Sequence, residues 1–406
     1  LFKAIQHNSK TRSAAIGGGM FNLFGGVTSK SGKPVNTTTA LTLSAFYNGL
    51  EMITNDFAKL PKGVYQNKDN KRKRATSHSN HYLISKKPNQ FMTEFMFHKM
   101  LVLHAIAKGN GYGEIERDSF TGFPKAIQLV DQDKTPVTVK KSNNKLYYHF
   151  NNKVVAAENM VHIPGFSFNG ITGISVIQHA ANSLGVALSS QEFSSEYYNS
   201  KGAGTIILAA NNTMDAAAKT RYAQAFKNHL DKPGQIKVAV ADDIKGVQHI
   251  NLTPAESQFL QTNKFAVEEI ARWLNIPTHK LKSTENSNYS NMESQNISHV
   301  AESMIPWIRK VEQEYDAKLF STTDRISGYY VKMNTGILLM ADKKTQAEYY
   351  SKMVSIGVMQ PNEVRGLMEL NAVDGLDENF IPVNLQSLET LAIKNKQLQK
   401  ELDNAE

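Results

Sequence analysis

Two predicted helical segments joined by a loop of small polar residues constrain the fold of this 406-residue chain more than any other feature. Apolar residues at three- and four-residue spacing predict helices over 254–274 and about 290–319. The loop between them, 282–291, reads Lys-Ser-Thr-Glu-Asn-Ser-Asn-Tyr-Ser-Asn and offers almost no apolar side chain to anchor it. Two long helices that flank such a loop are typical of a subunit of an assembly, and not of the surroundings of a catalytic pocket.

The loop itself permits two interpretations. From the residues alone, a disordered linker between two helices is the simpler one, because little holds the segment in place. If the helices present the loop at their shared end, however, its side chains can contact phosphate oxygens without reading a base sequence. The side chains suited to that contact are Lys280, Lys282, Asn286, Asn288 and Tyr289. Pro306 is expected to kink the second helix.

The rest of the chain alternates helical and extended segments, which predicts an α+β protein. A helix of 174–201 would be unusually long, and Gly357 and Pro361 separate two helices near the C-terminus. Residues 67–74 read as a charged turn, and 329–333 as a strand that returns to an earlier sheet. The other predicted helices are 40–59, 90–108 and 214–230, and the other strands begin at 62 and cover 112–116, 126–129, 135–140, 146–150, 160–163, 205–210, 236–240 and 247–252.

Length and composition exclude several classes of protein. A chain of this length can form two or three structural units, and no apolar run approaches the ~20 residues that span a bilayer. The sequence has no cysteine, which excludes disulfides, thiol catalysis and Cys-ligated zinc. The net charge of +9 gathers in the N-terminal half, so an acidic partner or nucleic acid is as plausible as a solvated surface. The run Lys71–Arg74 falls at a predicted hairpin tip and has the same two interpretations.

Catalytic signatures are close to absent, and we expect no catalytic residue, metal or cofactor. Residues 109–113 (Gly-Asn-Gly-Tyr-Gly) follow a helix and precede a strand, the reverse of a dinucleotide-binding loop, so a helix stop is favoured. Asp131 and Asp133 lie at a turn, as do Asp242 and Asp243, where aspartate is common without a metal. His78 and His81 have no third ligand nearby in the sequence.

Several motifs, taken in order, resemble the HK97-type family of tailed-bacteriophage portal proteins. The two most specific are Leu252–Glu256 continuing through Ile270–Pro277, and Asn291–Glu293 followed by Ile305–Trp307. One departure is Ile174-Ser175-Val176, where members of the family usually carry Ser-Pro. Weaker matches cover His81–Ile84 with Lys87–Asn89, Gly109–Tyr112, Gly122–Leu129, His162–Pro164, Gly170–Ser175 and Gly357–Arg365.

The resemblance implies a portal fold assembled as a ring, with an α/β wing, a helical stem, a small α/β clip and a helical crown. Its parts would be a flexible basic arm (1–34), the wing (35–170), stem helices (171–201 and 253–281), the clip (202–252), the tunnel loop (282–291), a kinked helix with the wing's return strand (292–336), and the crown with an acidic tail (337–406).

The implied function is a channel at one capsid vertex, through which double-stranded DNA enters and leaves. Implied partners are further copies of the chain, typically twelve in all, duplex DNA, the terminase motor, capsid or scaffold proteins, and head-completion or tail proteins, with assembly in the host cytoplasm. The resemblance adds Asn291 to the tunnel-loop residues expected to contact DNA. In the clip, the residues expected to contact the motor are Asn211, Lys227, Asp231 and Lys232. A nucleotide-dependent enzyme of DNA metabolism and another structural phage protein, such as a capsid or connector subunit, remain alternatives.

Overall fold

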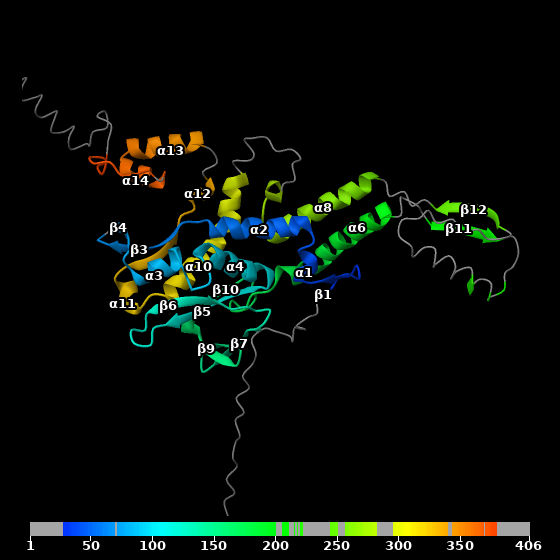
Figure 1. Cartoon of the computed structure of the whole chain (residues 1–406), viewed down its shortest axis with the longest axis horizontal. Coiled ribbons are helices and arrows are strands. Elements are labelled where there is room, and N and C mark those ends of the chain that lie inside the picture. Colours follow the sequence, from blue (N-terminus) through cyan, green and yellow to red (C-terminus); the bar gives the residue numbers. More distant parts are fainter. Residues whose placement is uncertain are drawn as a thin grey trace, which may run out of the picture. The chain divides into compact units, whose positions relative to one another are not determined.

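The chain forms two compact units, residues 1–335 and 336–406. The structure, a computed structural model, describes residues 27–69, 71–199, 205–210, 215, 217, 220, 221, 244–250, 256–281, 295–339, 343–368 and 370–379 (Figure 1). Helices and small antiparallel sheets are mixed along the chain, which confirms the predicted α+β class. Among the described residues, no helix combines the length and the apolar character that crossing a membrane requires.

Helices α2 (Ser44–Ala58) and α4 (Glu94–Ala107) pack together and form one part of the core. Both were predicted from their apolar spacing. The Thr93 side chain accepts a hydrogen bond from the Met96 amide and caps the start of α4. Five large apolar side chains of the two helices are fully buried: Phe46, Ile53, Phe57, Phe97 and Leu101.

Two three-stranded sheets follow α4 in the chain. One has the order β10-β5-β6 and the other the order β7-β8-β9. The predicted turn at Asn143 and Asn144 is present, with φ of 48° and 60°, values that suit a two-residue hairpin turn. The strands are β5 (Asn110–Arg117), β6 (Pro124–Leu129), β7 (Thr138–Ser142), β8 (Lys145–Phe150), β9 (Lys153–Ala156) and β10 (Met160–Pro164), and η1 (Ala157–Asn159) precedes β10. Tyr112, Val130, Val139, Tyr148, Val155 and Met160 form their shared core.

A third sheet has the order β13-β3-β4 and joins distant parts of the chain. Strand β13 (Tyr329–Met333) pairs with β3 (Lys62–Lys68), as predicted for a returning strand. The prediction of a charged turn over 67–74 is wrong, because Lys71–Arg74 pairs with β3 as strand β4. The charges do not prevent pairing, because β4 lies at the sheet edge and the side chains of Arg72, Lys73 and Arg74 are exposed to solvent.

The long helix predicted over 174–201 is two helices, α5 (Val176–His179) and α6 (Ala181–Asn199). The interruption falls at Ala180, which is fully buried, so packing and not a helix-breaking residue sets it. Helix α8 (Glu256–Leu274) confirms the prediction for 254–274 and packs against α6. Ser190 donates a hydrogen bond to Asn263 Oδ1 (3.1 Å) and Trp273 Nε1 donates to Ser183 Oγ (3.2 Å) between these helices.

Residues 27–35, most of which were assigned to a flexible arm, instead form a hairpin beside α6. Strand β1 (Val27–Thr28) pairs with β2 (Pro34–Val35), and the Lys30 amide donates to Asn182 Oδ1 (3.0 Å). Between α6 and α8, β11 (Thr205–Ala210) pairs with β12 (Ile244–Ile250), close to two of the predicted strands. The predicted helix 214–230 lies largely outside the described residues, and strand 236–240 lies wholly outside them.

The second unit contains α12 (Gly336–Leu339), α13 (Lys343–Ser355) and α14 (Pro361–Leu367). Gly357 has a φ of 72° after α13, and Pro361 begins α14, so the predicted separation of two helices is confirmed. The remaining elements of the first unit are α1 (Thr37–Ala40), α3 (Ser79–Ser85), η2 (Thr278–Leu281), η3 (His299–Met304), α10 (Ile305–Lys318) and α11 (Thr322–Ile326).

Candidate functional site at the base of segment 282–294

Segment 282–294 lies outside the described residues, but the residues before and after it are both held against helix α2. Before the segment, Leu281 is buried, and Asn48 of α2 donates a hydrogen bond to the Lys280 carbonyl (3.2 Å). After the segment, His299 Nε2 lies 2.9 Å from Asp56 Oδ2, also on α2. The described chain therefore leads into and out of the predicted loop along one helix.

A glycine in α2 makes the first of these contacts possible. A Cβ at Gly49 would overlap Leu274 Cδ1 and lie 3.1 Å from Ile276 Cδ1 and 3.3 Å from Leu281 Cδ2. The end of α8 and the turn η2 therefore occupy the space that a side chain on α2 would fill. Glycine costs about 1 kcal/mol inside a helix, and the packing of three apolar side chains offsets that cost.

Asn275 ends helix α8 and ties it to a break in the next helix. Its φ of 53° is in the left-handed region, which asparagine tolerates at a helix end. In a regular helix the Glu302 carbonyl would accept a hydrogen bond from the backbone amide of residue 306. Residue 306 is a proline and has no N–H, so that hydrogen bond is missing. Asn275 Nδ2 donates to that carbonyl instead (3.1 Å), and Ser303 Oγ donates to the Asn275 carbonyl.

The distortion predicted at Pro306 has the form of a π-helical turn, η3, directly before α10. Wide turns of this kind place an extra residue in the helix and are found where a helix is interrupted. The turn brings His299 onto Asp56, and both side chains are buried. The interruption therefore sets the position of the residue that anchors the far end of segment 282–294.

The electrostatics of this junction favour an ionised Asp56. Burial opposes ionisation, but hydrogen bonds from His299 and Lys59 outweigh it, and Lys280 adds a favourable charge, so the pKa of Asp56 lies below its usual value. Lys59 Nζ lies 2.7 Å from Asp56 Oδ1. Burial also lowers the pKa of His279, whose Nε2 lies 3.4 Å from Asn296 Oδ1. The junction is thus a polar anchor for both ends of the segment.

Of the residues proposed from sequence, the structure describes only Lys280. It is half-buried in η2, at the base of the predicted loop. The residues that fix this base, Gly49, Asp56, Asn275 and His299, were not singled out from the sequence. Asn275 had a usable signal, because an asparagine directly before Ile-Pro suits a helix end. Lys282, Asn286, Asn288, Tyr289, Asn291, Asn211, Lys227, Asp231 and Lys232 lie outside the described residues.

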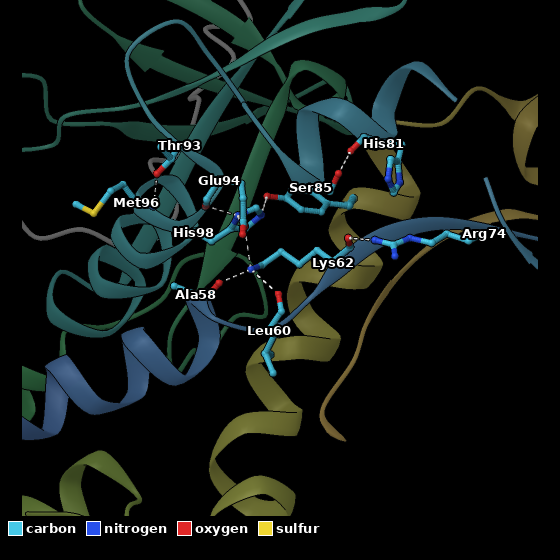
Figure 2. Close-up of polar contacts among 11 residues, drawn as sticks. Ala58, Leu60, Lys62, Arg74, His81, Ser85, Thr93, Glu94, Met96 and His98 are labelled. Atoms are coloured by element: carbon cyan, nitrogen blue, oxygen red, sulfur yellow. Dashed lines mark hydrogen bonds and ion pairs between the residues drawn. The ribbon is translucent and has the colours of Figure 1, made fainter. Parts of the chain in front are cut away.

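A second polar cluster, around Lys62 in Figure 2, combines a buried lysine, a glutamate and a histidine. Lys62 Nζ donates to the Ala58 carbonyl (2.7 Å), the Leu60 carbonyl (3.0 Å) and Glu94 Oε2 (3.1 Å). An ammonium group has three donors, and each is used here. Since the Lys62 side chain is fully buried, it has nothing left to offer a substrate.

The pKa values of this cluster follow from its burial. Burial lowers the pKa of Lys62 against the opposing charge of Glu94, and burial together with the charge of Lys62 lowers the pKa of His98. Burial opposes ionisation of Glu94, but His98 and Lys62 outweigh it, so its pKa is lowered. His98 Nδ1 faces the Glu94 carbonyl (2.7 Å) and Nε2 faces the Tyr315 hydroxyl (2.9 Å), the arrangement of a neutral imidazole. The cluster locks β3 to α4.

The glycine-rich stretch 109–113 is a packing site. Gly109 has a φ of 88° and its carbonyl accepts from the Gly165 amide (2.7 Å). A Cβ at Gly111 would overlap the Leu101 carbonyl oxygen. Protein backbone therefore fills the space in which a phosphate would have to bind. In the described part of the chain, no three His, Cys, Asp or Glu side chains are grouped so that they could hold a metal ion.

Comparison with known proteins decides the family. The model of the family described as "Phage portal protein" matches residues 44–369. The chain belongs to the phage portal protein family. This is a family of structural proteins and not of enzymes. The prediction of a portal protein is confirmed.

Two curated relatives carry the corresponding names. The chain is 24% identical to the portal protein of Enterobacteria phage HK97, over 84% of this chain and 82% of the relative. It is 26% identical to the probable portal protein of Streptomyces phage phiC31, over 90% of this chain and 83% of the relative.

Solved structures share the fold at low sequence identity. An HK97-family phage portal protein from Corynebacterium diphtheriae matches with a TM-score of 0.57 and 15% identity, over 78% of this chain and 99% of that one. A chain in the neck of an empty gene transfer agent particle, computed with C6 symmetry, matches with a TM-score of 0.55 and 16% identity, over 83% and 94%.

Asn275 provides a test of the junction. We expect Asn275→Ala to lower the free energy of unfolding by about 2 kcal/mol, because alanine disfavours the left-handed conformation and the Glu302 carbonyl loses its donor. Asn275→Gly keeps the backbone conformation accessible and should cost about half as much. Urea unfolding of the purified chain measures both. Equal losses for the two variants would show that the backbone conformation contributes nothing.

Glu94 provides a test of the buried cluster. We expect Glu94→Gln to cost about 3 kcal/mol at pH 7, because it leaves a buried ammonium without its counter-charge. The folded-state pKa of Glu94 is depressed, so its contribution is present above the unfolded pKa of about 4.3 and is lost as the pH falls through the folded pKa. The difference in the free energy of unfolding between wild type and variant should therefore disappear at acidic pH.

The matched control is Glu51→Gln, which removes a more exposed pair with Lys99 (2.7 Å) and should cost under about 1 kcal/mol. Urea unfolding curves of the wild type and both variants at several pH values measure these differences. A Glu94→Gln penalty that persists unchanged at the lowest pH would contradict the assignment of a charge pair.

Proposed function

We propose that this chain is the portal subunit of a phage-like particle, and that a ring of its copies forms the channel for duplex DNA at one capsid vertex. The observation that carries the proposal is membership of the portal family together with the double anchoring of segment 282–294 on helix α2. Anchoring both ends on one helix gives a polar loop a defined place in every subunit. A conduit needs that arrangement and needs no catalytic residue.

Exposed apolar side chains support assembly into a ring. Val186 of α6 is 50% exposed and Phe265 of α8 is 57% exposed, although the two helices pack against each other. Large apolar side chains that remain exposed on two long helices suit burial against a neighbouring copy. We propose rings of twelve, the number typical of the family, located in the virion after assembly in the host cytoplasm.

Segment 282–291 supplies the tunnel loop in this proposal. Its amide, hydroxyl and lysine side chains would contact phosphate oxygens without reading a sequence, among them Lys282, Asn286, Asn288, Tyr289 and Asn291. Few strong charges in the loop would keep each contact weak, so that DNA can slide. Lys280, in η2 at the base, would add a positive charge at the loop's root.

The remaining partners are assigned by domain. The insert between α6 and α8, which contains β11 and β12, would be the clip, where the terminase motor docks first and head-completion or tail proteins bind later. Asn211, Lys227, Asp231 and Lys232 are the candidate contacts there. The wing (35–170 with 292–336) would meet capsid or scaffold protein, α6 and α8 would form the stem, and residues 337–406 the crown and tail.

Ring assembly depends on the exposed apolar side chains in this account. We expect the double variant Val186→Asp and Phe265→Asp to remain folded but to lose assembly, because each change places a charge in an interface that should exclude water. Sedimentation velocity measures the assembly state and circular dichroism measures folding. The control is Ile326→Asp, since Ile326 is 83% exposed but lies in α11, outside the two stem helices. Unchanged assembly in the double variant would contradict the proposed interface.

Deleting 283–291 tests the loop. Rings should still form, because both anchors lie outside the deletion, while DNA packaging or retention should fall sharply. A Gly-Ser segment of the same length is the control that separates loop length from side-chain chemistry. A deletion that abolishes assembly, with no separate effect on DNA, would sink the tunnel-loop assignment.

A further inference from the structure

Strand β4 forms the edge of the β13-β3-β4 sheet and consists of four consecutive basic residues, Lys71–Arg74 (Figure 1). The described structure pairs it with β3 alone. Strand β3 runs outward from the buried Lys62 to the exposed Lys68, so the charges gather where the hairpin leaves the core. The proposed channel function does not use this feature.

Asp69, at the tip, is the single acidic residue of this hairpin, and it forms no ion pair with the described cations. Lys68, Arg72 and Lys73 are exposed, and in the described part of the structure no carboxylate lies within 4.0 Å of any of them. The register places Lys68 directly opposite Lys71. Like charges opposite each other destabilise a hairpin, so the sequence accepts a cost that an external anion would remove.

An aromatic pair holds one of these cations in place. The Arg72 guanidinium lies over the Tyr65 ring, 4.1 Å from its centroid, and the Tyr65 ring lies 6.1 Å from that of Tyr330. Residues that alternate along a strand share a face, so Arg72 and Tyr65 lie on the same face of the sheet. Stacking orders the guanidinium while its N–H donors stay free to bind a phosphate.

Arg74 is arranged differently from Lys68, Arg72 and Lys73. Its Nη2 lies 3.5 Å from the Lys62 carbonyl, back toward the root of the hairpin in Figure 2. The cations that remain available to a partner are therefore Lys68, Arg72 and Lys73, together on one short hairpin. The alternation of side chains places Arg72 on one face of the hairpin and Lys68 and Lys73 on the other, so cations surround its end.

Edge protection is the competing explanation, because lysines on an edge strand prevent pairing with other chains. A single charge is often enough for that purpose, and it requires neither a stacked arginine nor four cations in succession. The hairpin also has no exposed apolar anchor of the kind that a protein interface contains at its centre.

We propose that the β3–β4 hairpin binds the phosphate backbone of duplex DNA outside the channel, without reading its sequence. The proposal rests on the proposed function, since duplex DNA is the polyanion that a portal meets. Lys68, Arg72 and Lys73 would each contact a phosphate, and Tyr65 would position Arg72.

Covalently closed circular duplex DNA separates this surface from the channel, because a closed circle cannot thread a ring. We expect the full-length wild type to bind such a circle with an affinity that falls steeply with salt. The variant Lys68→Gln, Arg72→Gln and Lys73→Gln should have a log–log salt slope smaller by about 2 to 3, since each phosphate contact contributes about 0.9. Over a fourfold rise in salt, the wild type should therefore lose about 40-fold more affinity than the variant.

The control variant removes the same charge from another hairpin, with Lys140→Gln, Lys141→Gln and Lys145→Gln on β7 and β8. It should keep the wild-type slope. An equal change in both variants, an unchanged slope in the first, or no binding of the circle by the wild type would overturn the proposal. If the variant Lys68→Gln, Arg72→Gln and Lys73→Gln aggregates while the salt dependence of its DNA affinity is unchanged, the charges serve to protect the sheet edge and the proposal is wrong. None of these results bears on ring formation, which sedimentation reports separately.

Discussion

The absence of a side chain at Gly49 is the constraint on which the described arrangement depends. It lets the end of α8 and the turn η2 lie directly on α2, with Leu274, Ile276 and Leu281 in the space a Cβ would need. That contact fixes the direction in which the chain enters segment 282–294. Because α2 also packs against α4, the loop's root connects through one helix to the main core of the first unit.

The return from the segment depends on a defect in a helix. Pro306 removes one backbone donor, the π-helical turn η3 accommodates the loss, and Asn275 supplies the missing hydrogen bond from the end of α8. His299 then reaches Asp56 on α2. In a regular helix the Glu302 carbonyl would accept a hydrogen bond from the backbone amide four residues later, and no contact with α8 would be needed. The interruption is therefore what connects the two flanks of the loop.

The sequence predicted the parts of the fold that local patterns determine. The apolar spacing located α2, α4 and α8, and Asn143-Asn144 located a hairpin turn. The same signal at Asn151 and Asn152, with φ of 46° and 58°, was overlooked, and with it strand β9. The break at Ala180 has no local signal, because neither glycine nor proline is near it and buried packing decides it. The contacts that anchor the site, such as His299 with Asp56, join residues 243 positions apart, and periodicity cannot reveal them.

In the proposed portal ring, anchoring on α2 directs the same polar loop of each subunit toward a common axis. Single-particle cryo-electron microscopy of the purified full-length protein tests this claim directly. We expect closed rings with an open channel, in which segment 282–291 of every subunit lines the narrowest part. Rings that carry this segment on their outer rim, or a protein that stays monomeric under all conditions, would contradict it.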